Sequence, residues 1–202
     1  MTIYAIVNAL LSEESDPIGL DPVWSLISPS AILQGGNPYF VPDFDSRFLA
    51  TVALAVRIGK LGKGIAPRFA HRYVDAVAPA LLFIASGKLA RLREQGLPWT
   101  PAMSYDRSIA VGKFTSMDFD RINQCDCDVL LESEDAVRMA SWSPPPAGIP
   151  LEDILASLSR DNTLKTGDII LLGLSQGGPE VTPGLKAILK LNGEVSMRFN
   201  IR

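Results

Sequence analysis

The chain has 202 residues, of which 47% are apolar, and a formal net charge of −3 with one histidine and two cysteines. That length fits one domain of roughly 200 residues with a well-buried core. With His71 as the one imidazole, a zinc site that needs two histidines cannot form within one chain, and any Ser-His-Asp or Cys-His mechanism would have to use that residue. The slight acidity gives no basic surface for a phosphate backbone, so we expect no nucleic-acid partner.

The N-terminal residues and the apolar runs predict the compartment. No basic segment precedes the first apolar residues, and the acidic Glu13 and Glu14 follow soon after, so we expect no export signal and a cytoplasmic protein. The longest apolar stretch, residues 76–85, contains Pro79 and is well short of the roughly 20 residues that a membrane-spanning helix needs. We therefore expect no membrane partner.

The clearest predicted element is a strand over residues 48–58. Bulky side chains at its even positions alternate with small or polar ones at Thr51, Ala53, Ala55 and Arg57, which is the period of a strand with two different faces. We expect the bulky face to form core and the small face to have open space above it.

Weaker patterns predict the other elements in chain order. A short strand over 3–8 opens the chain, and a helix begins near Pro67 with Phe69, Tyr73, Ala76 and Val77 on one stripe. Further helices are expected over 89–95 and 150–159, and further strands over 163–173, 185–191 and 194–201, the last two joined by a turn at Asn192-Gly193. Without repeats or a break in composition, this pattern predicts a single β-rich α+β domain over residues 1–202.

Few motifs suggest chemistry by themselves. Asp43 and Asp45 could share a cation or divide acid and base roles, although such a pair beside Pro42 is more often a solvated turn. His71 is expected on a helix surface rather than as a general base. Cys125 and Cys127 would share a face of a strand, but no second Cys or His cluster completes a zinc site, so we expect buried or free thiols.

Several stretches, in their order and spacing, resemble the fumarylacetoacetate hydrolase family. They are Ile3–Asn8, Ser28–Leu33, Pro38–Phe44, Val56–Ile65, the helix containing Ala70–Tyr73, Leu92–Trp99 and Thr163–Ile170. The resemblance covers nearly the whole chain and implies the mixed β-sandwich roll of the family's C-terminal catalytic domain, with a few short helices.

The resemblance also implies where a metal centre would lie. The family holds Mg²⁺, Mn²⁺ or Ca²⁺ with two glutamates of an E-x-E strand and a later aspartate, and hard cations of this kind require anionic oxygens. At the corresponding positions this chain has Thr51, Ala53 and Leu82. We therefore expect no metal cofactor, and we interpret the chain as a degenerate member of the family.

The family's other functional positions have also changed. Ser12 stands where the resemblance implies the activating histidine, and Met103 where it implies the lysine of a K-x-F-D motif, of which Tyr105 and Asp106 remain. Leu172 and Leu174 stand in the late T-G-T-P loop. The first interpretation is a non-catalytic pseudoenzyme with a structural, regulatory or ligand-binding role.

Two alternatives stay open. The chain could be a hydrolase, isomerase or decarboxylase of a keto acid of the acylpyruvate or fumarylacetoacetate type that uses a relocated or metal-free site, with Asp43, Asp45, Arg57, Tyr105 or Asp106 as its groups. It could instead bind a small organic acid anchored by Arg57. Because family members commonly dimerise, the resemblance implies a homodimer or a heteromer with an active relative.

Overall fold

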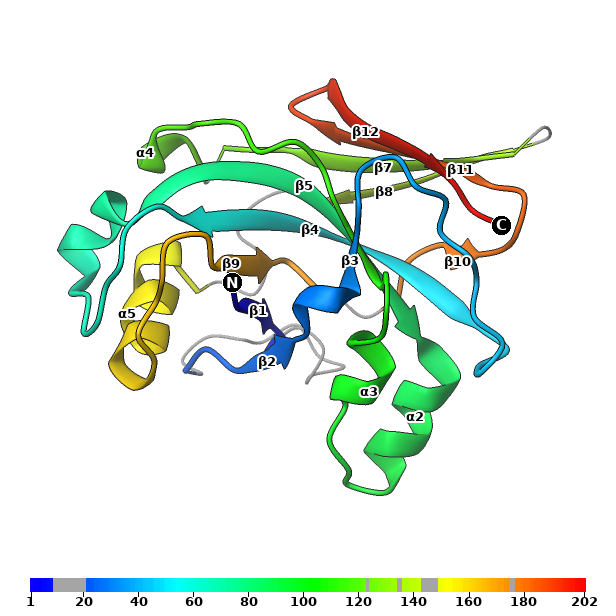
Figure 1. The fold of residues 1–202 in the computed structure, drawn as a ribbon, viewed down its shortest axis with the longest axis horizontal. Helices are drawn as coiled ribbons and strands as arrows, with labels where there is room; N and C mark the ends of the chain where they lie inside the picture. The colour runs from blue at the N-terminus through cyan, green and yellow to red at the C-terminus, as the bar shows by residue number, and fades with distance from the viewer. Residues whose placement is uncertain (9–20, 123, 134–135, 143–148, 175–176) are drawn as a thin grey trace.

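The computed structural model describes residues 1–8, 21–122, 124–133, 136–142, 149–174 and 177–202. Two β-sheets form its framework (Figure 1), which confirms the β-rich α+β class. The large mixed sheet has the strand order β2-β1-β9-β4-β5-β6-β3, with β10 paired to β4, and the small antiparallel sheet has the order β12-β11-β7-β8. The strands are β1 Ile3–Ile6, β2 Trp24–Ile27, β3 Ile32–Leu33, β4 Phe48–Ile58, β5 Val74–Ala85, β6 Ile109–Val111, β7 Cys127–Glu132, β8 Val137–Trp142, β9 Ile169–Leu172, β10 Glu180–Val181, β11 Lys186–Leu191 and β12 Glu194–Asn200.

Short helices join and cover these strands. They are the 3₁₀ helices η1 Pro29–Ala31 and η2 Pro67–Arg72 and the α-helices α2 Ser86–Glu94, α3 Thr100–Met103, α4 Phe119–Ile122 and α5 Leu151–Asp161. None of the helices within the described ranges is long and apolar enough to cross a membrane.

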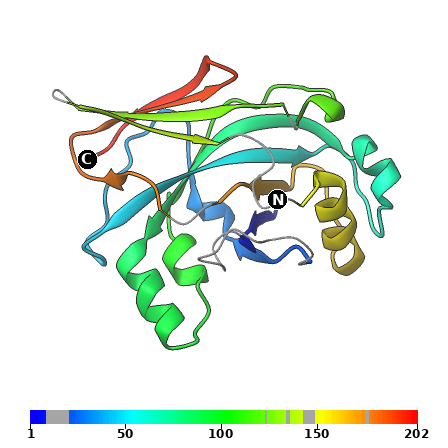
Figure 2. The ribbon, with the colours of Figure 1, turned by 180° about the vertical axis from the view of Figure 1, so that it is seen from behind.

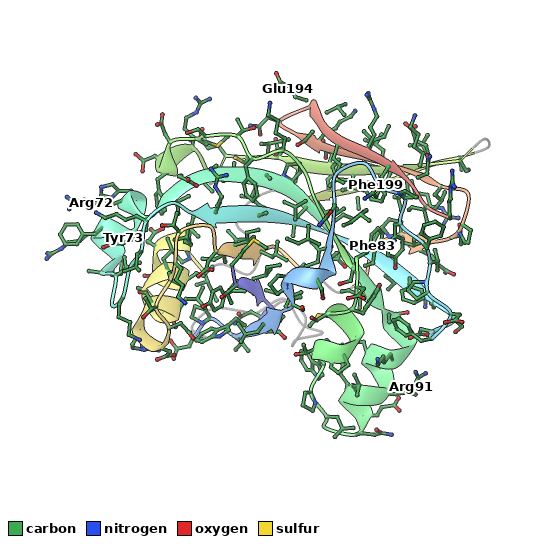
Figure 3. The ribbon with its side chains drawn as sticks, viewed as in Figure 1. Arg72, Tyr73, Phe83, Arg91, Glu194 and Phe199 are labelled. Atoms are coloured by element: carbon green, nitrogen blue, oxygen red, sulfur yellow. The ribbon has the colours of Figure 1, made fainter. Side chains whose placement is uncertain are left out.

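The first hydrophobic core lies between the two sheets. The even-numbered side chains of β4, from Ala50 to Ile58, and the inward side chains of the small sheet are buried together in it. Phe83 of β5 meets Phe199 of β12 edge-on, with ring centroids 6.2 Å apart, and both labelled rings lie between the layers (Figure 3). α5 adds Leu151, Ile154, Leu155 and Leu158 to the same core.

A second core lies on the opposite face of the large sheet. It combines the small side chains Ala53 and Ala55 of β4 with Leu82 and Ile84 of β5, and with residues of β1, β2, β6 and β9. Helices α2 and α3 contact β5 on this side, and Figure 2 shows them next to the strands from behind. Small side chains on a strand let the covering helices approach closely, so the predicted open space above this face is absent, and that prediction was wrong.

The predicted strand over 48–58 is confirmed by β4, but the helix predicted from Pro67 onward was wrong. Only η2 is helical there, and Ala76 and Val77 belong to β5, which pairs with β4 along its whole length. Ala76–Ala85 is buried on both faces of the sheet, so its residues are apolar throughout. An unbroken apolar run fits the two-residue repeat of a strand as well as the repeat of a helix, and the sequence alone cannot distinguish the two structures. The turn at Asn192-Gly193 is confirmed, with φ of 50° and 82°.

Candidate functional site

The three positions implied for metal ligands lie together in the second core. Thr51 and Leu82 are register partners across β4 and β5, and Ala53 follows Thr51 on the same face. Each of the three is at most 1% exposed. The three residues that the resemblance implies as metal ligands thus lie together in this chain, but their side chains carry no anionic oxygen.

The side chains above these positions are also apolar. Met103 at the end of α3 and Leu174 after β9 are fully buried in the same cluster as Ala53 and Leu82. Leu172 faces the other core instead, because successive residues of β9 alternate between the two faces. Ser12 lies outside the described residues.

Residues 177–179 run alongside β4, on the edge that also pairs with β9 and β10. The hydroxyl of Thr51 donates a hydrogen bond to the Gly177 carbonyl at 3.4 Å, and the Ala50 amide donates to the Pro179 carbonyl at 3.0 Å. A Cβ at Gly178, whose φ is +132°, would lie 2.1 Å from the Ala50 carbonyl oxygen, so only glycine permits this approach. This close backbone contact covers the end of β4 where Thr51 lies.

These residues do not fit the divalent cation that the family implies. Such a cation takes six or more oxygen ligands and needs carboxylates to offset its dehydration, whereas this position offers one hydroxyl among methyl, thioether and aliphatic groups. Across the described part of the chain, no three His, Cys, Asp or Glu side chains gather as a metal site.

Arg57 and Tyr105, two members of the candidate replacement site, lie at opposite ends of β4. The Arg57 guanidinium binds Asp75 in a bidentate ion pair, with Nε–Oδ1 and Nη2–Oδ2 distances of 2.8 and 3.0 Å, and lies over the Phe114 ring. Tyr105 packs on Phe48, nine positions away along β4, which corresponds to about 30 Å of extended chain. The two residues therefore cannot act on one small ligand.

Tyr105 belongs to an aromatic cluster rather than to an open pocket. Its hydroxyl lies 3.0 Å from that of Tyr39 and donates to the Phe83 carbonyl at 3.1 Å, and its ring meets Phe44 and Phe48 edge-on. Burial, with a smaller contribution from the neighbouring Tyr39, raises the pKa of Tyr105 far above its usual value. This phenol thus stays protonated and serves packing.

Asp106 differs from Tyr105, because it lines a polar depression with a volume of about 360 Å³. The other lining residues are Ser30, Ile32, Gln34, Asn37 and Arg107. Arg107 adopts a φ of +62°, which is uncommon for a residue with a side chain, and its amide donates to the Ser30 carbonyl at 3.3 Å. Sequence reasoning identified Asp106 but missed Arg107, because nothing in the pattern indicates a positive φ there.

The other candidate groups have structural surroundings. The Asp45 carboxylate accepts hydrogen bonds from the amides of Lys88 and Arg47, at 2.5 and 3.3 Å, whereas Asp43 is exposed. His71 is exposed on η2, as predicted for a surface histidine.

Both cysteines are buried and free, which confirms the prediction for them. Burial raises the pKa of Cys125 and of Cys127, so both thiols stay protonated at neutral pH.

Comparison with known proteins matches almost the whole chain. The sequence profile described as fumarylacetoacetate (FAA) hydrolase C-terminal matches residues 10–198. Oxaloacetate tautomerase FAHD1, mitochondrial, of Mus musculus is 28% identical over 182 residues, which cover 90% of this chain and 81% of the relative. Oxaloacetate decarboxylase, mitochondrial, of Dictyostelium discoideum is 26% identical over 178 residues, which cover 85% and 78%.

Solved structures share the fold. A fumarylacetoacetate hydrolase family protein from Yersinia pestis CO92 has a TM-score of 0.84 at 21% identity, with 100% of this chain and 93% of that chain covered. The fumarylpyruvate hydrolase of Pseudomonas aeruginosa, solved with Mn²⁺ and pyruvate, has a TM-score of 0.77 at 18% identity, with 100% and 89% covered. The chain belongs to the fumarylacetoacetate hydrolase family.

Proposed function

We propose that this chain, as a member of the family, binds or converts a keto acid. It does so without a divalent cation at the position where the resemblance implies the family's metal. The observation that carries the proposal is the apolar lining of that position, where Ala53, Leu82, Met103 and Leu174 are buried in one hydrophobic cluster beside Thr51. The keto-acid class comes from the relatives, which are named as an oxaloacetate tautomerase and an oxaloacetate decarboxylase.

The proposal has two forms. In the enzymatic form the keto acid is converted to a product, and in the binding form, which is non-catalytic, it is only bound. The names of the relatives favour turnover by a relocated, metal-free site over a non-catalytic role. Keto–enol tautomerisation requires only that a base accept a proton from carbon and that an acid return one to oxygen, so it does not demand a cation. The non-catalytic form is favoured by the absence of an ionisable side chain at the family's position itself.

The polar depression beside Asp106 is the place that we propose for the enzymatic form. Arg107 has no ion-pair partner among the described residues, so its guanidinium is available to a ligand carboxylate. The Asp106 carboxylate on the same wall would exchange the proton, and the amides of Gln34 and Asn37 would bind the carbonyl oxygens. Arg57, which is already paired with Asp75, is a weaker anchor for an organic acid.

The test combines metal analysis with activity. We expect purified protein to contain far less than one equivalent of Mg²⁺, Mn²⁺ or Ca²⁺. Oxaloacetate tautomerisation, oxaloacetate decarboxylation and acylpyruvate hydrolysis are then followed with excess EDTA and with added Mn²⁺. Turnover that Mn²⁺ does not stimulate supports the enzymatic form, and a ligand-induced rise in melting temperature without turnover supports the binding form.

Variants locate the site. Arg107→Gln should abolish both the ligand-induced rise in melting temperature and any turnover. Asp106→Asn should lower turnover at least tenfold while leaving ligand binding in place. The matched control is Arg91→Gln, because Arg91 is exposed on α2 and points away from the molecule (Figure 3). Stoichiometric metal together with Mn²⁺-dependent turnover would overturn the proposal.

A further inference from the structure

One end of the molecule carries a positive charge that the overall composition does not predict. The turn after β4 and helix η2 hold the cations Lys60, Lys63, Arg68 and Arg72, and all four are exposed. The whole chain has a net charge of −3, so the rest of it is more acidic still. Figure 3 shows Arg72 and Tyr73 at one end of the long axis of the molecule.

Close backbone contacts hold these segments together. The Gly59 amide donates a hydrogen bond to the Tyr73 carbonyl at 2.8 Å, and a Cβ at Gly62 would lie 2.5 Å from the Tyr73 ring. Gly62 also pairs with Leu164 in a β-bridge, which brings a fifth exposed cation, Lys165, next to this turn. We refer to the five cations as the basic end.

Aromatic rings order three of these cations. The Cζ atoms of Arg68 and Arg72 lie 4.8 and 4.6 Å from the centroid of the Phe69 ring, and the Lys60 Nζ lies 5.9 Å from that of Tyr73. Both rings are half-buried. A guanidinium or an ammonium over a ring keeps its charge and its N–H donors, so the stacking fixes the cations without neutralising them.

Carboxylates of the same chain do not neutralise the basic end. Among the residues that the structure describes, none of its five cations forms an ion pair. Asp75 binds Arg57 and Asp161 binds Arg160, and the acids in the first turn of α5 form no ion pair with the basic end either. Cations that gather without counter-charges repel one another, so a negatively charged partner would relieve this repulsion.

We propose that the basic end binds an acidic segment of a partner protein, with carboxylates at alternate positions and an apolar side chain between them. The Cζ atoms of Arg68 and Arg72 both lie within 5 Å of one ring centroid, so they are at most about 9 Å apart. In an extended peptide, side chains at alternate positions point the same way and repeat about every 7 Å. Two carboxylates of such a segment can therefore each accept paired hydrogen bonds from one guanidinium.

The exposed Leu61 favours a protein segment over other anionic partners. Its side chain is 61% exposed, and in the sequence it lies between Lys60 and Lys63. An apolar side chain of a peptide can cover it, whereas a phosphate backbone offers it nothing. One leucine is also a small area for insertion into a lipid surface, because the rings of Phe69 and Tyr73 lie half-buried among the cations.

The experiment measures the binding of two labelled peptides by fluorescence anisotropy. One has the sequence Glu-Ala-Glu-Leu-Glu-Ala-Glu, and the other has glutamine in place of every glutamate and carries the same label. We expect the acidic peptide to bind at least tenfold more tightly than the neutral one. Raising the salt from about 50 to about 200 mM should weaken its binding, because the contacts are between exposed charges.

Variants assign the binding to the basic end. Arg68→Gln with Arg72→Gln should weaken binding of the acidic peptide at least tenfold. Arg68→Lys with Arg72→Lys keeps the charge but loses the paired donors, so its binding should fall between the two. Leu61→Gln should weaken binding about threefold through the lost apolar contact.

Controls separate the basic end from folding and from charge in general. Lys186→Gln with Lys190→Gln removes the same charge from β11 and should leave binding unchanged. Circular dichroism checks that each variant is folded, and Lys60→Gln with Lys63→Gln, which leaves both arginines in place, should also weaken binding if the arginine variants are unstable.

Three outcomes would overturn the proposal. They are failure of the acidic peptide to bind, equal loss of binding in the β11 control variant, and tighter binding of a thymidine oligonucleotide or of phosphatidylserine vesicles than of the acidic peptide. The basic end lies beyond Ile58, at the opposite end of β4 from Phe48 and Tyr105, so these outcomes leave the keto-acid tests unaffected.

Discussion

The phenol of Tyr105, which the family resemblance assigns to a K-x-F-D motif, is part of the packing in this fold. It is held between the Tyr39 hydroxyl and the Phe83 carbonyl inside a group of aromatic rings that join β4, β5 and the segment before β4. Burial raises the pKa of both tyrosines, so the folded state favours their neutral forms.

This pair predicts a loss of stability in alkali. A folded-state pKa above the unfolded value of about 10 gives stability that is fully present below pH 10 and is lost as the pH rises further. Tyr105→Phe should lower the free energy of unfolding by about 1–2 kcal/mol at pH 7.5, because the hydrogen bonds of its hydroxyl are lost. Above pH 10 the variant should lose stability less steeply than the wild type. Urea denaturation of both proteins at pH 7.5, 9, 10 and 11 measures their free energies of unfolding. If these fall equally with pH in the variant and the wild type, the prediction is refuted.

Helix α2 depends on a side chain from a distant part of the sequence. Its N-cap residue is Ala85, which has no side-chain acceptor, and the Asp45 carboxylate instead accepts the Lys88 amide hydrogen bond. A carboxylate at this end also interacts favourably with the helix dipole. Asp43 and Asp45 look equivalent in the sequence, but their surroundings differ. Asp43 is exposed, whereas Asp45 caps helix α2.

A matched pair of substitutions tests this division. Asp45→Ala should reduce the free energy of unfolding by about 0.5–2 kcal/mol, the usual cost of losing a helix cap. Asp43→Ala, two residues away and exposed, should stay within about 0.5 kcal/mol of the wild type. Thermal denaturation followed by circular dichroism compares the two, and equal melting temperatures for both variants would contradict the assignment of Asp45 as the cap.

A strand whose two faces differ in side-chain size, or a turn with its own residue signal, could be predicted from the sequence, and a strand with bulky apolar side chains on both faces could not. β4 shows a two-residue period because its two faces differ in side-chain size, and Asn192-Gly193 carries its own turn signal. β5 has no such contrast, since residues 76–85 are apolar at every position. The resemblance located Thr51, Ala53 and Leu82, but the pairing of Arg57 with Asp75 and the positive φ of Arg107 depend on contacts between distant segments.

At the scale of the molecule, strands β4 and β5 belong to both hydrophobic cores. Val52 and Leu81 face the small sheet, while Ala53 and Leu82 face helices α2 and α3. Loosening either core therefore removes packing from the strands that support the other, and the two cores should unfold together.

Truncation at the centre of the second core tests this cooperation. Leu82→Ala should lower the free energy of unfolding by about 2–5 kcal/mol through a cavity, whereas Leu26→Ala, at a position 53% exposed on β2, should change it little. The far-UV circular dichroism and the tryptophan fluorescence of Leu82→Ala should show one shared midpoint in urea. Two separated transitions would show that the cores are independent units.

The apolar packing around Leu82 also limits how this sequence can change. A single carboxylate placed at Leu82 or Ala53 would be buried without a partner at a cost of several kcal/mol, a large part of the roughly 5–15 kcal/mol that holds a domain folded. A cation would offset that cost only after several carboxylates were present together. Stepwise substitution towards a metal centre would therefore pass through poorly folded intermediates, so a buried metal centre at these positions is not reached by single changes.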